Sequence, residues 1–212
     1  MFSSTLRVSA LGLALGFLAT TAAPGADEKK EEKKVELKVG DAAPAFEART
    51  ESDATWESAA RFGKKWVVVY FYPGDFTPGC TAQANAFRDA MHKLTEKGVE
   101  VVGISGDAVG THELFKKAQK LNFTLLSDED GIVARKFGVP LTPGATVRAK
   151  DPDGKFSKDA DGKFVELKRK ATAARWTFVI GKDGKIAYMN TKVNPADDAK
   201  KITEFILKAE EK

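Results

Sequence analysis

Cys80 is the only cysteine in the 212-residue chain, and its sequence context suits a reactive thiol. It follows an apolar run of β-branched and aromatic residues, Trp66–Tyr72, which predicts a buried strand. Pro73 and the glycine after it end that strand, and Thr77-Pro78 is typical of the N-cap and first position of a helix. Cys80 would then be the third helical residue, close to the Thr77 hydroxyl and to the positive end of the helix dipole, where thiols ionise more easily.

The same setting predicts a cationic partner for Cys80. A thiol with the ordinary pKa of about 8.5 is only ~3% ionised at pH 7, and mostly ionised thiol needs a pKa lower by about two units, or ~2.7 kcal/mol. A helix terminus typically supplies ~0.3–1 kcal/mol. A free cysteine is commonly a small buried hydrophobic residue, but the residues around Cys80 are turn and cap types and no apolar stripe includes it. We therefore expect a cation from elsewhere in the chain.

Several segments, taken together and in order, resemble a known family. The pattern Pro73-x-x-x-Thr77-x-x-Cys80 is similar to the active-site signature of the peroxiredoxins, and the wider segment Phe71–Thr81 resembles the peroxiredoxin Q (bacterioferritin comigratory protein) branch. The resemblance runs from about Val39 to Ile186 with one insertion, through Val39–Phe46, Val102–Asp107, Phe123–Asp128, Arg175–Ile180 and Gly184–Ile186. It implies an α/β, thioredoxin-like fold with the N-terminal additions of peroxiredoxins.

The resemblance also implies a reaction and the residues that carry it. The Cys80 thiolate would attack hydrogen peroxide or an organic hydroperoxide and become a sulfenic acid. Thr77 would hold the peroxide oxygen and orient the sulfur, and Pro73 would shield the thiolate from water. Backbone N–H groups at the helix start would face the developing charge. No metal or other cofactor is expected, because a thiolate can break the weak O–O bond by direct displacement.

Arg175 is the cation that the resemblance implies, lying just before the strand expected at 176–180. It would supply the remaining stabilisation of the thiolate and stabilise charge as the O–O bond lengthens. Its alternative role is that of an ordinary arginine at a strand end. Arg61 and Arg88 are weaker candidates.

The chain departs from the family pattern at Asn85. Many peroxiredoxin Q members carry a resolving cysteine at that position, five residues after the first cysteine, and here no second cysteine exists. The prediction is therefore a 1-Cys peroxidase whose sulfenic acid is reduced by an external thiol, either a thioredoxin-like protein or a low-molecular-weight thiol. The alternative is a non-catalytic binding module of the thioredoxin fold that has kept the motif.

The rest of the chain alternates strand and helix signals, as an α/β sheet requires. Strands are expected at 66–72, 99–105, 123–126, 176–180 and 185–190, and helices at 78–96, 112–120 and 130–137. In the second helix Leu114, Phe115, Ala118 and Leu121 are expected to face inward. A last helix is expected to have Asn194 as N-cap, Pro195 as its first residue, Asp197 and Asp198 in its first turn, and Ile202, Phe205 and Ile206 on one face.

Residues 1–26 predict a secretory signal peptide. Arg7 is their only charged residue, the apolar stretch Val8–Leu18 follows it, and small residues fill Ala19–Ala26. The apolar stretch is too short to span a bilayer, so a permanent membrane helix is the weaker reading. Residues 27–38, charged in both signs, predict a flexible spacer before a peroxiredoxin domain at 39–212. The leader predicts export, most simply to the periplasm of a Gram-negative cell.

A polar insertion at about 145–174 contains a near-repeat, Asp151–Phe156 and Asp159–Phe164. Alignment with a calcium-binding EF-hand loop puts Lys168 where the bidentate glutamate belongs, which argues against calcium. The Asp-Gly pairs predict hairpin turns between short strands instead. We interpret the run Lys168-Arg169-Lys170 as a solvated patch.

The residue inventory excludes several other chemistries. A disulfide oxidoreductase of the same fold needs two cysteines, and a cysteine hydrolase needs a nearby histidine base. His92 lies about three turns along the cysteine's own helix and His112 begins another, so both are expected at the surface. A zinc site lacks ligands and no Gly-rich phosphate loop occurs. The net charge of +4 comes from 34 basic and 30 acidic residues spread in both signs, which does not indicate nucleic-acid binding.

Overall fold

The computed structural model describes Met1, residues 35–151 and residues 153–211, and in this part of the chain a seven-stranded mixed sheet forms the centre. Its strand order is β11-β10-β3-β4-β5-β1-β2. These strands are β1 (Glu47–Thr50), β2 (Thr55–Glu57), β3 (Val67–Phe71), β4 (Glu100–Ser105), β5 (Thr124–Ser127), β10 (Trp176–Ile180) and β11 (Ile186–Asn190). The helices are α1 (Pro78–Glu96), α2 (Val109–Gln119), α3 (Ile132–Lys136) and α4 (Asp198–Glu210), with a short 3-10 helix at Ser58–Ala60.

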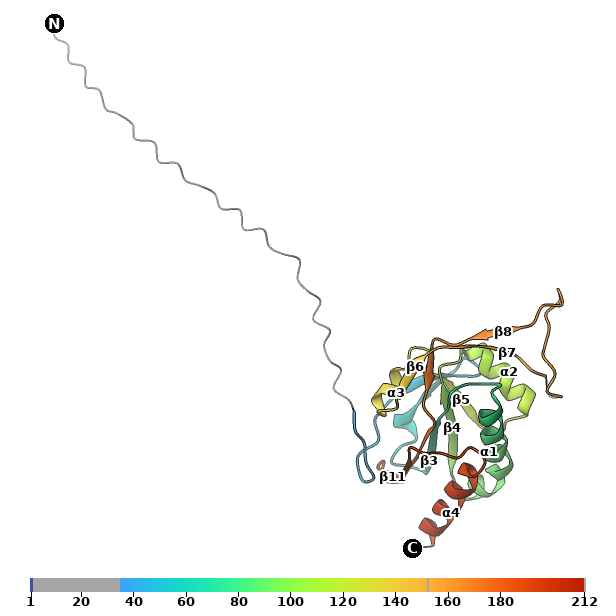
Figure 1. Cartoon of the computed structure of the whole chain (residues 1–212). Helices are drawn as coiled ribbons and strands as arrows, with labels where there is room; N and C mark the ends of the chain where they lie inside the picture. The colour runs from blue at the N-terminus through green and yellow to red at the C-terminus, as the bar shows by residue number, and fades with distance from the viewer. Residues whose placement is uncertain (2–34, 152, 212) are drawn as a thin grey trace. The chain divides into compact units, whose positions relative to one another are not determined.

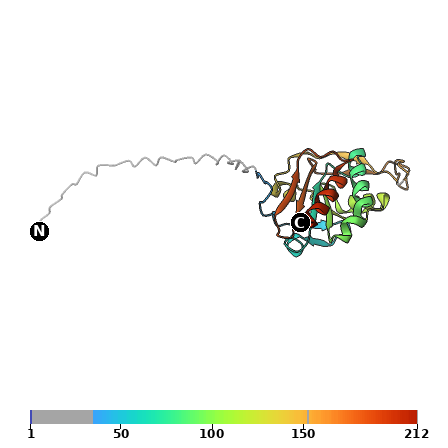
Figure 2. The same cartoon turned by 90° about the horizontal axis from the view of Figure 1, so that it is seen from below.

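The central strands β3, β4 and β5 are parallel, and antiparallel strands flank them on both sides. All five residues of β3 are buried, which explains its uninterrupted apolar sequence. Helices α1, α2 and α4 cover one face of the sheet, where Phe87, Phe115 and Ile202 join one buried cluster. Helix α3 packs on the other face, where Trp56 of the edge strand β2 joins the same buried cluster. Helices α1 and α4 run side by side, as Figures 1 and 2 show.

The helix predicted at 78–96 is confirmed at both ends, and the predicted strands agree to within one or two residues. The predicted start of the last helix is wrong, because α4 begins at Asp198. Asn194 caps a turn instead of a helix: its side-chain oxygen accepts the Ala196 N–H at 3.1 Å and its carbonyl accepts the Asp197 N–H at 3.2 Å. An asparagine side chain that bonds backbone two residues on favours such a turn.

The inward orientation predicted for Leu114 is also wrong, since this side chain is 46% exposed. Helix α2 begins three residues before the predicted start and buries Thr111, His112 and Phe115. This face places Leu114 toward solvent, whereas Ala118 and Leu121 pack on the core as expected.

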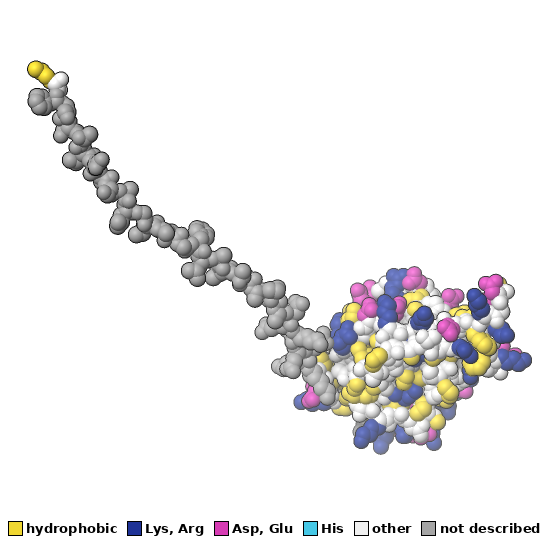
Figure 3. Space-filling model, turned by 45° about the horizontal axis from the view of Figure 1, so that its top comes forward, with side chains coloured by type: hydrophobic (Ala, Val, Ile, Leu, Met, Phe, Trp, Pro, Cys, Tyr) yellow, Lys and Arg dark blue, Asp and Glu magenta, His cyan; other side chains and the backbone are white. Residues whose placement is uncertain are grey.

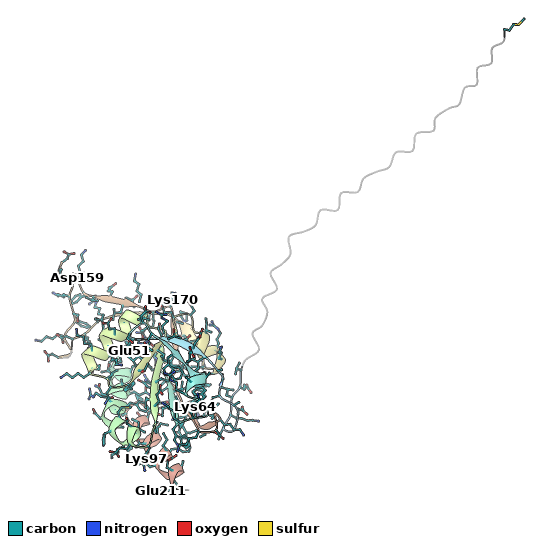
Figure 4. The ribbon with its side chains drawn as sticks, turned by 180° about the vertical axis from the view of Figure 1, so that it is seen from behind. Glu51, Lys64, Lys97, Asp159, Lys170 and Glu211 are labelled. Carbon is teal, nitrogen blue, oxygen red and sulfur yellow. The ribbon has the colours of Figure 1, made fainter. Side chains whose placement is uncertain are left out.

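The polar insertion forms a projection with a paired base. Strands β7 (Thr146–Arg148) and β8 (Glu166–Lys168) pair antiparallel, and β6 (Leu141–Pro143) pairs with β9 (Ala171–Ala173) below them. Figure 4 shows Asp159 at the outer end of the projection and Lys170 where it meets the domain. In the face that Figure 3 shows, basic and acidic side chains are interspersed over this projection and the domain.

Both Asp-Gly segments of the insertion form tight turns, as predicted. In the first turn the Asp151 carboxylate accepts the N–H groups of Asp153 and Lys155, and in the second Asp159 repeats the pattern. Three residues at equal sequence spacing, Ala149, Ser157 and Val165, close a ring of backbone hydrogen bonds in which each N–H donates to another member's carbonyl. Among the described residues, no group of three His, Cys, Asp or Glu side chains is arranged to hold a metal.

The N-terminal predictions fall mostly on residues 2–34, outside the part that the structure describes. Of the predicted spacer, residues 35–38 are described, and Leu37 packs against the core on the α3 side of the sheet. Within the described residues, no helix is both long enough and apolar enough to cross a bilayer.

Candidate active site

Cys80 occupies the third position of α1, as predicted, and its side chain is 1% exposed. Thr77 is the N-cap in extended conformation, and Pro78 is the first helical residue. The Thr77 hydroxyl does not cap the helix. It turns back and donates to the carbonyl oxygen of Gly74 at 3.0 Å, inside the loop that leads from β3 to α1.

Arg175 reaches the sulfur. Strand β10 runs antiparallel to β3 with Trp176 opposite Phe71, so the residue before β10 lies beside the loop that follows β3. The Arg175 Nη2 donates to Cys80 Sγ at 3.1 Å. The cation expected from sequence is therefore in contact with the sulfur of Cys80.

The two weaker candidates have other partners. Arg61 pairs with Glu100 at 3.3 Å and donates to the Glu57 carbonyl. Arg88 donates to the side chains of Asn85 and Asp89 and to the Gln119 carbonyl.

A buried amide binds Arg175, and a buried carboxyl group binds that amide in turn. Gln83, one helical turn after Cys80, accepts a hydrogen bond from Arg175 Nη1 and donates from Nε2 to the Asp198 carboxylate at 2.7 Å. The Thr177 hydroxyl donates to the same Asp198 oxygen at 2.7 Å. Burial raises the pKa of Asp198, while the hydrogen bonds from Thr177 and Gln83 act in the opposite direction.

Sequence reasoning did not assign Gln83 or Asp198 to the site. The available signal was the spacing of Gln83, a polar residue one helical turn after Cys80 and therefore on the same face of the helix. Asp198 gave no such signal, because an acid at a helix start is ordinary.

The loop between β3 and α1 has an unusual backbone conformation and is bonded to buried charged side chains. Phe76 has φ of 59°, in the left-handed region that costs a non-glycine residue on the order of 1 kcal/mol. The Asp75 N–H donates to the Asp107 carboxylate at 2.8 Å. The Asp75 carboxylate accepts from the Tyr72 hydroxyl at 2.8 Å and lies 2.8 Å from Nδ1 of His112.

The surface position predicted for His112 is wrong, since its side chain is fully buried, whereas His92 is exposed as predicted. A polar residue near the start of an amphipathic helix is expected to face solvent, but His112 instead pairs with the buried carboxylate of Asp75. Burial alone lowers the pKa of His112, and the charge and hydrogen bond of Asp75 more than offset this, so that the pKa is raised. The pKa of Asp107 is raised by burial and by the charge of Asp75.

The solvated patch predicted at Lys168-Arg169-Lys170 is wrong for its central residue. Arg169 is 6% exposed, between two exposed lysines. Its Nη1 donates to the Pro73 carbonyl at 2.5 Å, and its Nε lies 3.2 Å from the Asp107 carboxylate. A run of three cations gives no local sign that one of them has buried partners.

The structure thus places the four predicted residues around one loop and one helix start. Pro73 and Thr77 lie in the loop, Cys80 lies in the first turn of α1, and Arg175, just before β10, contacts the sulfur. A buried thiol at a helix N-terminus with a guanidinium group on its sulfur is suited to nucleophilic attack as thiolate.

Comparison with known proteins identifies the family. The model of the AhpC/TSA family matches residues 39–189. The chain belongs to this family. A protein of Coxiella burnetii named "Putative peroxiredoxin bcp" is 38% identical over 157 residues, which cover 74% of this chain and 90% of the relative.

Plant and bacterial relatives place the chain in the peroxiredoxin Q branch, as predicted. The rice "Peroxiredoxin Q, chloroplastic" is 48% identical over 120 residues, which cover 54% of this chain and 55% of the relative. The chain thus spans about half the length of that relative. Peroxidoxin BcpB of Mycobacterium tuberculosis is similar in structure, with a TM-score of 0.63, 28% identity, and coverage of 81% of this chain and 97% of that one.

The bacterioferritin comigratory protein of Xanthomonas campestris has a TM-score of 0.60 and 27% identity, with coverage of 79% of this chain and 92% of that one. These likenesses confirm the predicted thioredoxin-like α/β fold with the additions of peroxiredoxins.

Replacing Arg175 by methionine should slow the reaction of Cys80 with iodoacetamide at pH 7 by roughly 10- to 100-fold. Methionine fills part of the space but removes a charged hydrogen bond worth about 1.5–3 kcal/mol. Stopped-flow alkylation measures the rate, and ultraviolet absorbance of the thiolate reports the ionised fraction.

Arg88→Met is the matched control, because Arg88 is a cation on α1 whose donors go to other groups. Equal rates in the Arg175 variant and the unaltered protein would show that another group stabilises the thiolate.

Proposed function

We propose that this protein is a thiol peroxidase that reduces hydrogen peroxide and organic hydroperoxides at Cys80. The observation that carries the proposal is the 3.1 Å contact of Arg175 with a buried sulfur in the first turn of α1. Membership in the AhpC/TSA family supports the same chemistry.

In the proposed reaction the Cys80 thiolate attacks one oxygen of the hydroperoxide. The S–O bond forms as the O–O bond breaks, the sulfur is oxidised to a sulfenic acid, and the leaving oxygen takes up a proton as water or an alcohol. Arg175 stabilises the thiolate before the step and the negative charge on the oxygens during it.

The hydrogen bond of Thr77 suggests how the substrate is oriented. Because the hydroxyl donates its hydrogen bond to the Gly74 carbonyl, its oxygen has a lone pair free to accept a hydrogen bond from a ligand. It would accept a hydrogen bond from the O–H of the hydroperoxide, while Arg175 donates to a peroxide oxygen. Pro73, which has no N–H, would keep water from the thiolate.

Cys80→Ser should abolish peroxide consumption with dithiothreitol as reductant and leave the fold intact. Serine occupies nearly the same space, but its hydroxyl does not ionise at neutral pH and does not reduce peroxides. Loss of peroxide is measured directly, with circular dichroism as the check on folding. Substantial turnover by the serine variant would contradict the mechanism, and an inactive unaltered protein would favour a non-catalytic binding module.

For turnover we propose a 1-Cys cycle with an external thiol. Cys80 is the only cysteine, so the sulfenic acid has no partner in its own chain. Two external thiols would return it to the thiol, with release of water and formation of their own disulfide. The reductant would be a thioredoxin-like protein or a low-molecular-weight thiol.

Peroxide treatment without reductant should therefore leave a sulfenic acid that dimedone traps, and excess peroxide should carry it to sulfinic acid. Mass spectrometry of the Cys80 peptide distinguishes these states. Sustained turnover in the absence of any added thiol would contradict the 1-Cys cycle.

Asn85→Cys is the informative comparison. Cα atoms five residues apart in an intact helix are roughly 8–9 Å apart, beyond the ~7 Å limit for a disulfide. An internal disulfide in this variant would show that the start of α1 unwinds after oxidation. Absence of a disulfide would show that the helix stays intact after oxidation and that reduction of the sulfenic acid depends on an external thiol.

We also propose export of the protein, on the basis of the leader-like residues 1–26. The exported form should begin between Pro24 and Asp27, which N-terminal sequencing of the periplasmic fraction would establish. Recovery of soluble cytoplasmic protein with an intact Met1 would contradict this proposal.

A further inference from the structure

One side chain of the insertion, Arg169, makes hydrogen bonds to the backbone of the active-site loop. The base of the insertion fixes the backbone of this residue, since its N–H donates to the Ala145 carbonyl at 3.0 Å. Its carbonyl lies so close to Gly144 that a Cβ there would be 1.9 Å from the oxygen. The backbone of Arg169 is therefore held in place, and its side chain extends to the loop backbone.

The guanidinium group of Arg169 binds two backbone carbonyls of the loop, those of Pro73 and Asp75. Nη1 donates to the Pro73 carbonyl at 2.5 Å, and Nη2 lies 3.5 Å from the Asp75 carbonyl. Gly74, between them, has no side chain, and a Cβ at this position would lie 1.6 Å from Nη1. The glycine thus permits the close approach of the guanidinium group to the loop backbone.

The third carbonyl of the same loop segment, that of Gly74, accepts the Thr77 hydroxyl. Each of the three successive carbonyls from Pro73 to Asp75 thus lies near a side-chain donor. Arg169 supplies the donors for the first and third carbonyls, and Thr77 supplies the donor for the second. The ion pair of Arg169 with Asp107, whose other oxygen accepts the Asp75 N–H, attaches the loop to the sheet as well. Displacing Arg169 would release the Pro73 and Asp75 carbonyls, which lie on either side of the Gly74 carbonyl that accepts the Thr77 hydroxyl.

We propose that Arg169 is a positioning residue for the peroxide site, through which the insertion at 145–174 holds the loop Pro73–Phe76 and sets the direction of the Thr77 hydroxyl. The peroxide-binding part of this inference rests on the proposed function. Arg169 acts through the loop and not on the sulfur, which Arg175 contacts.

Arg169→Met tests this role by keeping the long apolar stem and removing all donors. The second-order rate constant for hydrogen peroxide should fall by roughly 10- to 100-fold, as misplacement of a reacting group by about 1 Å does. The rate with iodoacetamide should not fall, because Arg175 still contacts the thiol. Hydrogen exchange of the amides at 74–82 should become faster, with the sheet unaffected.

Lys170→Met is the matched control: Lys170 is exposed and pairs with Glu129 and Asp130. It should match the unaltered protein in all three measurements.

Arg169→Lys keeps the positive charge beside Asp107 but lacks the planar group that reaches two carbonyls. If Arg169→Met does not fold, Arg169→Lys is measured in its place. The lysine variant should also lose peroxide reactivity relative to alkylation, by a smaller factor than methionine. An unchanged ratio of peroxide to iodoacetamide rates in the folded variants, or unchanged exchange at 74–82, would overturn the proposal.

Failure of the proposed function would look different. The unaltered protein would then consume no peroxide, while loop exchange would still respond to Arg169→Met.

Discussion

Burying the carboxylates of Asp75 and Asp107 beside one another is the constraint from which the geometry of the active-site loop follows. Each acid removed from water needs a cation or strong donors, and two adjacent acids need more. His112 supplies a partner from α2 and Arg169 supplies one from the insertion. The loop brings these groups together along a path that puts Phe76 in the left-handed region.

The site combines two guanidinium groups with separate tasks. Arg175 lies against the sulfur, and its own orientation depends on Gln83 and Asp198, so that α1, β10 and α4 converge behind Cys80. Arg169 lies against the backbone of the loop. The guanidinium group on the sulfur and the one on the loop backbone thus come from different parts of the chain.

What could be predicted from sequence depended on the range of the interactions involved. The start of α1 at Pro78 and the place of Cys80 follow from neighbouring residues, because caps and turns are local. Arg175 could be assigned by resemblance, since its segment matches a family motif. Arg169, His112 and Asp198 could not, because their partners are distant in sequence and a charged residue alone does not reveal a buried counter-charge.

Local patterns also misled where two turns compete. Asn194-Pro195 has the residues of a helix start, yet an asparagine turn is equally compatible with them and delays α4 until Asp198. Leu114 and Phe115 are both large and apolar, and only the contacts of α2 with the sheet decide which is buried. Tertiary contacts decide such cases because the local energy differences are small.

The closed ring of Ala149, Ser157 and Val165 constrains how the insertion can vary in length. The two turns lie between the three ring residues, so each turn carries the chain from one ring residue to the next. Loss or gain of a single residue would put the wrong backbone group at the junction, whereas change by a whole repeat alters only the number of members. Variation among descendants of this chain should therefore occur in whole repeats, and it can proceed outside the paired base that carries Arg169.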